Sequence, residues 1–207
     1  MNKFPPRIYL ASRSPRRREL LTQMGIRYEV LLLRDSADRQ DLDEAPLADE
    51  SPHDHVLRIA ADKAQLGWQR VLQRRLPQYP VLGADTSITL DGEIFGKPGT
   101  KDNTIRMLTQ LSGRTHEVQT AVALVYREYV QHLISKSSVT FKSLTAEEIE
   151  CYANSGEPLD KAGAYAIQGR GAIFVEQLVG SYSGVMGLPI FETSTLLNQL
   201  KLHGYPG

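Results

Sequence analysis

Hydrophobic residues recur along this chain either at helical spacing or in short continuous runs. The helical spacing is clearest after Ser51-Pro52, in the series Leu57, Ala60, Ala64, Trp68 and Val71. Because serine can cap free helix amides and proline fits the first helical turn, this series predicts a helix to about residue 75. Similar start signals predict further helices that begin near residues 15, 145 and 189, and a polar helix is expected from about residue 102 to Gly113.

The continuous runs are short and rich in β-branched residues, and they predict strands. Such runs lie at residues 7–12, 28–33, 81–90 and 172–179. Residues 115–130 and 131–141 predict a long hairpin, whereas the acidic stretch 34–51 and the glycine-spaced stretch 180–189 predict loops. Because helices and strands mix without regular βαβ alternation, we expect an α/β fold with a mixed, twisted sheet and flanking helices.

Composition narrows the class of protein. The 207 residues carry 24 basic and 24 acidic side chains, so a general nucleic-acid coat or a basic membrane-surface protein is disfavoured. No apolar run approaches the roughly 18 residues of a membrane helix. The single cysteine, Cys151, excludes an intramolecular disulfide framework and a cysteine-rich zinc site. We expect Cys151 to be a small core residue and the protein to be cytoplasmic.

The sharpest local feature is a run of four arginines, Arg13, Arg16, Arg17 and Arg18, at a predicted strand-to-helix junction. Cations at a helix N-terminus are unfavourable by about 0.3–1 kcal/mol each. Free amides, the hydroxyls of Ser12 and Ser14 and the guanidinium groups together favour a polyphosphate site. The alternative is a solvated basic surface.

Two charged residues interrupt apolar elements. Lys63 lies in the apolar stripe of the predicted helix, so it either extends to solvent or meets an anion. Asp85 lies inside the apolar strand predicted at 81–90. Two roles would explain a carboxylate there: a metal-binding or general-base group, or a structural group bonded to backbone amides. Asp43-Glu44 could hold a hard cation such as Mg²⁺, and Lys97 stands on a loop just after that strand's turn.

Several common site patterns are absent from the sequence. Neither a G-x-x-x-x-G-K-[ST] phosphate loop nor a G-x-G-x-x-G fingerprint occurs. The five histidines show no metal-ligand spacing, and no Ser-His-Asp or Cys-His grouping is suggested. Kinase, dinucleotide-binding and triad chemistries are therefore disfavoured.

Taken together, the motifs resemble those of the Maf family of nucleoside triphosphate pyrophosphatases, over about residues 7–200. The matching segments are ASRSPRRRELL at 11–21, DE at 43–44, RIAADKA at 58–64, GADT at 83–86, GKP at 96–98, LSG at 111–113, DKAGAY at 160–165, QG at 168–169, GSY at 180–182 and GLP at 187–189. The arginine-rich opening joined to the later Gly-Ala-Asp-Thr is specific, whereas any one piece is not.

The resemblance implies a single Maf-like domain over residues 1–207, similar in fold to inosine triphosphatases, elongated and two-lobed with the active cleft between the lobes. It also implies hydrolysis of a nucleoside triphosphate to the monophosphate and pyrophosphate, with a divalent cation, Mg²⁺ or alternatively Mn²⁺ or Co²⁺. Asp85 would accept the proton of the attacking water, and Glu44 would assist and share the metal with it. Phosphate contacts are implied for Ser12, Ser14, Arg16, Arg17, Lys63 and Lys97.

Three positions place the chain beside family members that prefer dTTP and UTP rather than 7-methyl-GTP: Arg16, Thr86 and Gln168. A glutamine amide offers both a donor and an acceptor, which suits the imide edge of thymine or uracil. The resemblance also implies a house-cleaning role, in which modified pyrimidine nucleotides are candidate substrates beside dTTP and UTP. Two departures from the family pattern are a longer stretch at about 33–40 and Ser183-Gly184 where an asparagine is common.

Two functions are therefore weighed, and a nucleoside triphosphate is the expected substrate in the first. The first is the pyrophosphatase; the alternative is a non-catalytic nucleotide- or nucleic-acid-binding regulator of cell division, since the family is associated with septum inhibition. The carboxylates favour the enzyme, because a pure anion binder needs no acids beside its phosphates. We expect no membrane association, no general nucleic-acid binding, and a homodimer as the candidate assembly.

Overall fold

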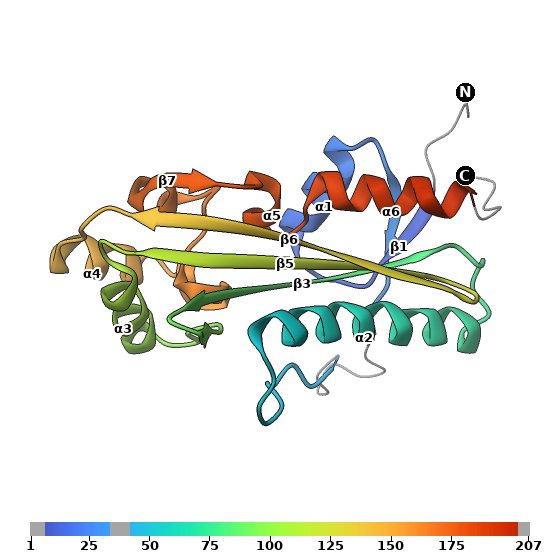
Figure 1. The fold of residues 1–207 in the computed structure, drawn as a ribbon, viewed down its shortest axis with the longest axis horizontal. Helices are drawn as coiled ribbons and strands as arrows, with labels where there is room; N and C mark the ends of the chain where they lie inside the picture. The colour runs from blue at the N-terminus through green and yellow to red at the C-terminus, as the bar shows by residue number, and fades with distance from the viewer. Residues whose placement is uncertain (1–6, 34–41, 203–207) are drawn as a thin grey trace. The chain divides into compact units, whose positions relative to one another are not determined.

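A computed structural model describes residues 7–33 and 42–202, with side chains to residue 200. The chain divides into two compact units (Figure 1). Unit 1 comprises residues 1–85, 120–134 and 187–207, and unit 2 comprises 86–119 and 135–186. Among the described residues, no helix is both long enough and apolar enough to cross a membrane.

The sheet is mixed, with the strand order β2-β1-β3-β5-β6-β7 and β4 paired to β3. β1 (Arg7–Leu10) pairs in parallel with both β2 (Arg27–Val30) and β3 (Val81–Leu90). β4 (Glu93–Phe95) pairs antiparallel with β3. β7 (Val175–Val179) pairs antiparallel with β6 (Tyr129–Phe141). With its helices, this sheet confirms the α/β class predicted from the sequence.

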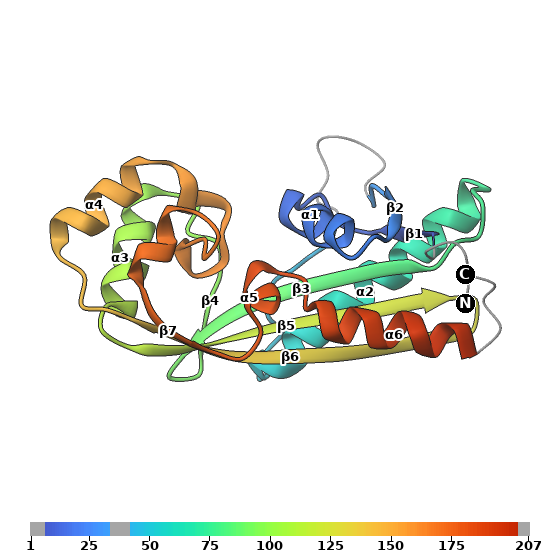
Figure 2. The ribbon, with the colours of Figure 1, turned by 90° about the horizontal axis from the view of Figure 1, so that it is seen from above.

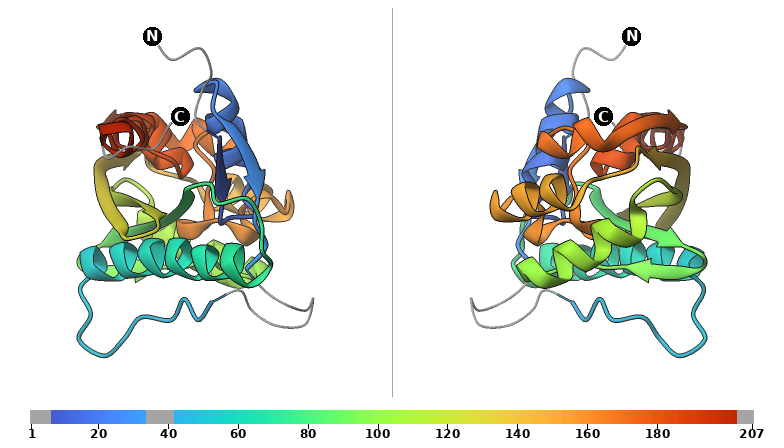
Figure 3. Two further views of the ribbon diagram at one scale, coloured as in Figure 1. Left: turned by 90° about the vertical axis from the view of Figure 1, so that its right-hand side faces the viewer. Right: turned by 90° about the vertical axis from the view of Figure 1, so that its left-hand side faces the viewer.

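Unit 1 surrounds its strands with three helices, α1 (Pro15–Gln23), α2 (Pro52–Gln73) and α6 (Ile190–Leu202). α1 lies beside β1 and β2 (Figure 2), and α2 and α6 cover opposite faces of the strands in this unit (Figure 3). α2 begins where Ser51 Oγ accepts a hydrogen bond from the Asp54 amide at 3.1 Å, as the sequence predicts.

Close packing of α2 against β3 depends on a glycine. A Cβ at Gly83 would lie 2.3 Å from the Ala60 carbonyl oxygen and 2.7 Å from the Ala64 amide nitrogen. Small residues on both sides complete this contact, because Ala60 and Ala64 pack with Ala121 of β5 (Thr115–Tyr126). Asp85, two residues after Gly83, is thereby fixed relative to the middle of α2.

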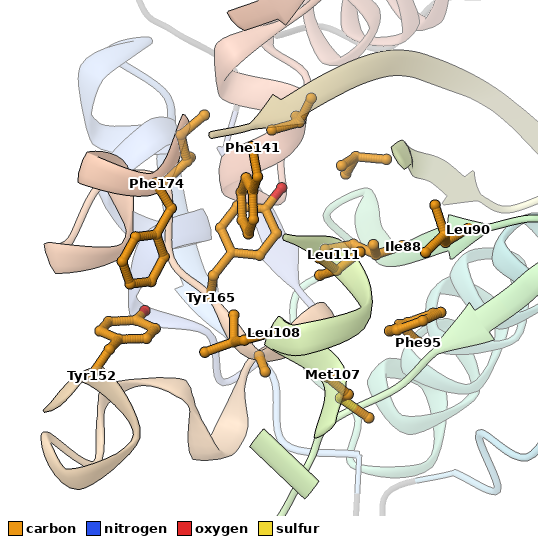
Figure 4. Packing of buried hydrophobic residues seen from close by; sticks show 14 of the residues in the cluster. Ile88, Leu90, Phe95, Met107, Leu108, Leu111, Phe141, Tyr152, Tyr165 and Phe174 are labelled. Carbon is orange, nitrogen blue, oxygen red and sulfur yellow. The ribbon is translucent and has the colours of Figure 1, made fainter. Parts of the chain in front are cut away.

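Unit 2 holds an aromatic core between α3 (Lys101–Leu111) and α4 (Ala146–Asn154) and the strands (Figure 4). Phe141, Tyr165, Tyr152 and Phe174 meet edge to face, with ring centroids 4.8–6.0 Å apart in the contacting pairs. Three short 3-10 segments, η1 (Glu157–Asp160), η2 (Ala162–Ala164) and η3 (Arg170–Phe174), connect α4 to β7.

Most predicted elements are confirmed, but several of their bounds are wrong. The first two strands end at Leu10 and Val30, two and three residues before their predicted ends. The β5–β6 hairpin turns at Arg127-Glu128, three residues before the predicted position. The last strand begins at Val175, because residues 170–174 form η3 instead. The predicted loop 180–189 contains a short helix, α5 (Tyr182–Met186). The expected long stretch at about 33–40 lies, after Leu33, outside the described residues.

The expectation for Cys151 is also wrong, because its side chain is exposed. The buried stripe of α4 consists of Ile149, Tyr152 and Ala153, at helical spacing. Cys151 lies between these positions and therefore off the stripe, where a helix presents its residues to solvent.

Candidate active site

The junction of β1 and α1 holds a fixed arginine. Ser12 Oγ accepts hydrogen bonds from the Ser14 amide at 3.2 Å and from Arg17 Nη1 at 3.1 Å. Arg17 Nε donates to the Gly187 carbonyl oxygen at 2.7 Å, so both edges of this guanidinium are oriented. Ser14 is the N-cap residue, but its side chain makes no capping bond within the described part of α1. The hydroxyl that accepts an amide hydrogen bond here is that of Ser12.

The four arginines of this junction differ in exposure. Arg13 and Arg18 are exposed, whereas Arg16 and Arg17 are half-buried. The pKa of Arg17 is lowered overall, mainly by burial and also by the neighbouring charge of Arg16. The carboxylates of Asp85 and Glu44 act in the opposite direction and raise it. The electrostatic coupling links the arginine cluster to the two carboxylates singled out in the sequence.

Lys63 lies between those two carboxylates. Its Nζ is 2.9 Å from Asp85 Oδ1 and 2.6 Å from Glu44 Oε1. Lys63 is 7% exposed, and the side chains of Asp85 and Glu44 are 14% and 42% exposed. Lys63 therefore meets anions rather than solvent, and Asp85 binds an ammonium rather than backbone amides. The sequence had left both choices open.

The loop that carries Glu44 is tied to α2. Arg58 Nη2 donates to the Ala45 carbonyl oxygen at 3.1 Å, and Arg58 Nε donates to Glu50 Oε1 at 2.5 Å. Glu50 Oε2 also accepts from the Leu47 amide at 3.1 Å. The hydrogen bond from Arg58 is the main cause that lowers the pKa of Glu50 to about 2. Sequence reasoning missed this support, although Arg58 opens one of the matching motifs.

The donor set allows a cation without showing a preformed cage. Glu44 and Asp85 direct one carboxylate oxygen each at the same point, the Lys63 ammonium. Two carboxylates together with phosphate oxygens are ligands that Mg²⁺ prefers. Within residues 7–33 and 42–202, no group of three or more His, Cys, Asp or Glu side chains is arranged to hold a metal ion.

The other predicted site residues belong to unit 2 and are described only within it. Thr86 follows Asp85 in β3 and is half-buried, and Lys97 is exposed after β4. Gln168 is exposed in the turn Ala166–Gly169, which the Gly169 amide closes on the Ala166 carbonyl oxygen at 3.1 Å. The structure thus brings together Ser12, Arg17, Glu44, Lys63 and Asp85, all in unit 1.

Comparison with known proteins gives consistent matches. The family model described as Maf-like protein matches residues 7–200. The chain is 54% identical over 195 residues to a dTTP/UTP pyrophosphatase of Cupriavidus pinatubonensis, covering 94% of this chain and 97% of that relative. It is 49% identical over 208 residues to a dTTP/UTP pyrophosphatase of Aromatoleum aromaticum, covering 100% of both.

Among solved structures, the Staphylococcus aureus Ham1 protein matches with a TM-score of 0.43 and 13% identity, over 65% of this chain and 71% of that chain. No conclusion about function rests on a similarity of that size. The family model and the relatives together cover nearly the whole sequence. This chain belongs to the Maf family.

Proposed function

We propose that this protein is a nucleoside triphosphate pyrophosphatase that hydrolyses dTTP and UTP to the monophosphate and pyrophosphate. The observation that carries the proposal is the Lys63 ammonium, which holds the carboxylates of Asp85 and Glu44 at 2.9 and 2.6 Å. The printed names of the relatives supply the substrates. Modified pyrimidine nucleotides are further substrates of the same proposed reaction.

In the proposed reaction, Asp85 accepts a proton from water. The water oxygen bonds to a phosphorus of the α–β anhydride, the bridging bond breaks, and pyrophosphate leaves. Lys63 donates to Oδ1 of Asp85, so we assign Oδ2 as the oxygen that accepts the proton of the water. A general base must be held within hydrogen-bond reach of the proton that it takes. The β3 backbone and the Lys63 contact provide that fixed position.

The phosphates are proposed to bind where cations and free amides meet. The guanidinium of Arg17, held by Ser12 and Gly187, stands at the N-terminus of α1, where amides and the helix dipole favour anions. Charge spread over several triphosphate oxygens is stabilised by several donors rather than by one. The full set that we propose is Ser12, Ser14, Arg16, Arg17, Lys63 and Lys97.

Glu44 and Asp85 are proposed to hold a divalent cation together with phosphate oxygens, because both carboxylates contact the Lys63 ammonium and therefore lie close to each other. Such a cation, when bound, neutralises phosphate charge and polarises the phosphoryl oxygen. Base selection is assigned to Arg16, Thr86 and Gln168. The cytoplasmic location, the homodimer and the cleft between two lobes stay predictions.

A nucleotide panel tests the proposal. Purified protein with Mg²⁺ is incubated with dTTP, UTP, CTP and 7-methyl-GTP, and pyrophosphate release is measured. We expect dTTP and UTP to be preferred, and Asp85→Asn to lower kcat/KM for UTP at least about 100-fold, since it removes the general base. Asp91→Asn is the matched control, because Asp91 lies at the β3–β4 turn and pairs with exposed Arg114.

Release that survives Asp85→Asn unchanged contradicts the role of Asp85. Tight binding of UTP without any pyrophosphate release overturns the enzyme and favours the non-catalytic regulator instead. Replacing Mg²⁺ by Mn²⁺ or Co²⁺, or removing it with a chelator, tests the cation. Activity that is insensitive to the chelator rejects the metal role of Glu44 and Asp85.

A further inference from the structure

The turn that carries Gln168 is unusually well anchored for a surface turn. Residues 163–167 are buried, and Gln168 is the exposed residue that follows them. The Gly169 amide donates to the Ala166 carbonyl oxygen at 3.1 Å, so Ile167 and Gln168 occupy the two central positions. The side chain of Gln168 therefore leaves a buried backbone at a defined point.

A hydrogen-bonded pair, Tyr152 and Glu157, grips this turn on both sides. The Tyr152 hydroxyl accepts from the Ala166 amide at 3.1 Å and donates to Glu157 Oε1 at 2.8 Å. Glu157 Oε2 accepts from the Arg170 amide at 3.2 Å, and Oε1 accepts from the Gly171 amide at 3.3 Å. The pair thus binds backbone two residues before Gln168 and two and three residues after it.

Two glycines allow the backbone to approach the pair so closely. A Cβ at Gly169 would lie 2.6 Å from each carboxylate oxygen of Glu157. A Cβ at Gly171 would lie 2.8 Å from the Tyr152 hydroxyl oxygen and 3.0 Å from the Ala166 carbonyl oxygen. Side chains at these positions would displace the turn, so Gly169 and Gly171 are needed for the contacts of the turn with Tyr152 and Glu157.

The pair is itself fixed by its surroundings. Tyr152 meets Phe174 edge to face at 5.0 Å between ring centroids (Figure 4), which orients the tyrosine ring and its hydroxyl. Burial alone would raise the pKa of Glu157, but the hydrogen bonds from Tyr152 and from the Arg170 and Gly171 amides outweigh it and lower the pKa. Glu157 is therefore a carboxylate that accepts from the Tyr152 hydroxyl and from two backbone amides.

We infer that Tyr152 and Glu157 are positioning residues for base selection, which hold the turn so that the Gln168 amide meets the imide edge of the pyrimidine. The inference rests on the proposed function, because it assigns Gln168 to the base. Hydrogen bonds weaken steeply when distance or angle departs from the optimum. A displaced turn would therefore cost selectivity between uracil, which presents a ring N–H and a carbonyl, and cytosine, which presents a ring acceptor and an amine.

Glu157→Gln and Tyr152→Phe test the inference. The new amide of Glu157→Gln turns an N–H₂ toward backbone donors, and Tyr152→Phe removes the hydroxyl that joins Ala166 to Glu157. We expect either variant to lower the ratio of kcat/KM for UTP to that for CTP about tenfold, mainly through KM for UTP, as one strained or lost hydrogen bond implies. Glu147→Gln is the matched control, because Glu147 is an exposed carboxylate on α4, the helix of Tyr152, and this variant should leave the ratio as it is.

A double-mutant cycle distinguishes positioning of Gln168 by Tyr152 and Glu157 from a purely structural role of the pair. If the pair acts through Gln168, Glu157→Gln changes the UTP/CTP ratio by less than about twofold once Gln168→Ala is present. Equal losses on UTP and CTP, a lower melting temperature with an unchanged ratio, or additive effects with Gln168→Ala overturn the inference. Tyr152→Phe, which keeps the ring, provides the second variant if Glu157→Gln fails to fold.

Failure of the proposed function gives a different result. Wild-type protein that releases no pyrophosphate from UTP refutes the pyrophosphatase itself. Dissociation constants for UTP and CTP, measured by calorimetry in the Asp85→Asn background, still give the ratio for every variant of the pair. An unchanged binding ratio there refutes the inference, whatever the outcome for turnover.

Discussion

Lys63 is the side chain that keeps the two carboxylates of the candidate active site together. Asp85 and Glu44 each place an oxygen within 3 Å of its Nζ, and Lys63 and Asp85 are nearly buried. Two carboxylates this close repel each other in the absence of a cation. Lys63 therefore has a part in folding that is separate from any part in chemistry.

Removing the ammonium should reveal both parts. We expect Lys63→Gln to lower the free energy of unfolding by about 3 kcal/mol, because breaking a buried pair leaves uncompensated charge. The double variant with Asp85→Asn should regain most of this stability while activity on UTP stays lost. Urea unfolding and pyrophosphate release measure the two effects. A double variant that is no more stable than Lys63→Gln would contradict the charge argument.

The sequence shows that Lys63 interrupts an apolar stripe, and the need for either a path to solvent or an anionic partner follows from that pattern alone. Its partners do not, because Glu44 and Asp85 are 19 and 22 residues away in the sequence and meet it only through tertiary packing. The Tyr152–Glu157 pair was missed for the same reason, since neither residue breaks a local pattern. Residue types predict which side chains need partners, and the fold supplies the partners.

At the scale of elements, the contact of α2 with β3 positions the site. Gly83→Ala would force a Cβ against the Ala60 carbonyl oxygen at 2.3 Å and the Ala64 amide at 2.7 Å, and backbone atoms cannot move aside as a side-chain end can. We expect a loss of about 1–3 kcal/mol in the free energy of unfolding, as for other overpacked cores. Urea denaturation measures it.

Gly96→Ala is the matched control, because a Cβ at Gly96 meets nothing within 4 Å. It should leave the unfolding midpoint nearly unchanged. An equal loss in both variants would contradict the helix–strand contact as the cause, because a change from glycine to alanine by itself restricts the unfolded chain and favours folding.

Elements whose bounds are marked by two independent sequence features, such as a capping residue and an apolar stripe, are predicted well. Elements marked by a single feature are not. α2 has both a cap and a stripe, and its start at Pro52 is confirmed. The β5–β6 turn carries Arg127 at φ 54° without a glycine or asparagine, between strands of similar composition, so the sequence alone does not locate it. α5 was missed because its five residues include Gly184, a poor helix former.

At the scale of the whole molecule, His116 couples stability to pH. It is 2% exposed in the aromatic core, its Nε2 is 2.9 Å from the Tyr165 hydroxyl oxygen, and burial lowers its pKa to about 4. Below about pH 6.5 the unfolded chain protonates this imidazole and the folded protein does not. Protonation therefore favours unfolding between about pH 6.5 and 4.

We expect the free energy of unfolding to fall over that range by up to about 3 kcal/mol through His116 alone. His116→Gln should reduce the slope of stability against pH, whatever it does to stability itself. Urea unfolding at several pH values gives both slopes. His132→Gln, at an exposed position, should keep the wild-type slope, and a wild-type slope in His116→Gln would disprove the assignment.

The mixed sheet was predictable because helices and strands follow one another without regular βαβ alternation. The order in which the chain enters its two units was not predictable. The chain passes from one unit to the other after Asp85, Gln119, Ile134 and Met186. The first of these passages lies within β3 and the next two within β5 and β6. Hydrophobic patterning is continuous through each strand and therefore carries no mark of the passage.

The division of each unit into separate segments of the chain has a consequence during synthesis on the ribosome. Unit 1 includes residues 187–207, and three leucines of α6, Leu196, Leu197 and Leu200, are buried in it. The parts of unit 1 made first must therefore wait for the last helix before their core closes, although nascent domains usually fold in order of emergence. Unit 2, made in between, is complete earlier. For this chain, we therefore expect the core of unit 2 to close before that of unit 1, although the synthesis of unit 1 begins first.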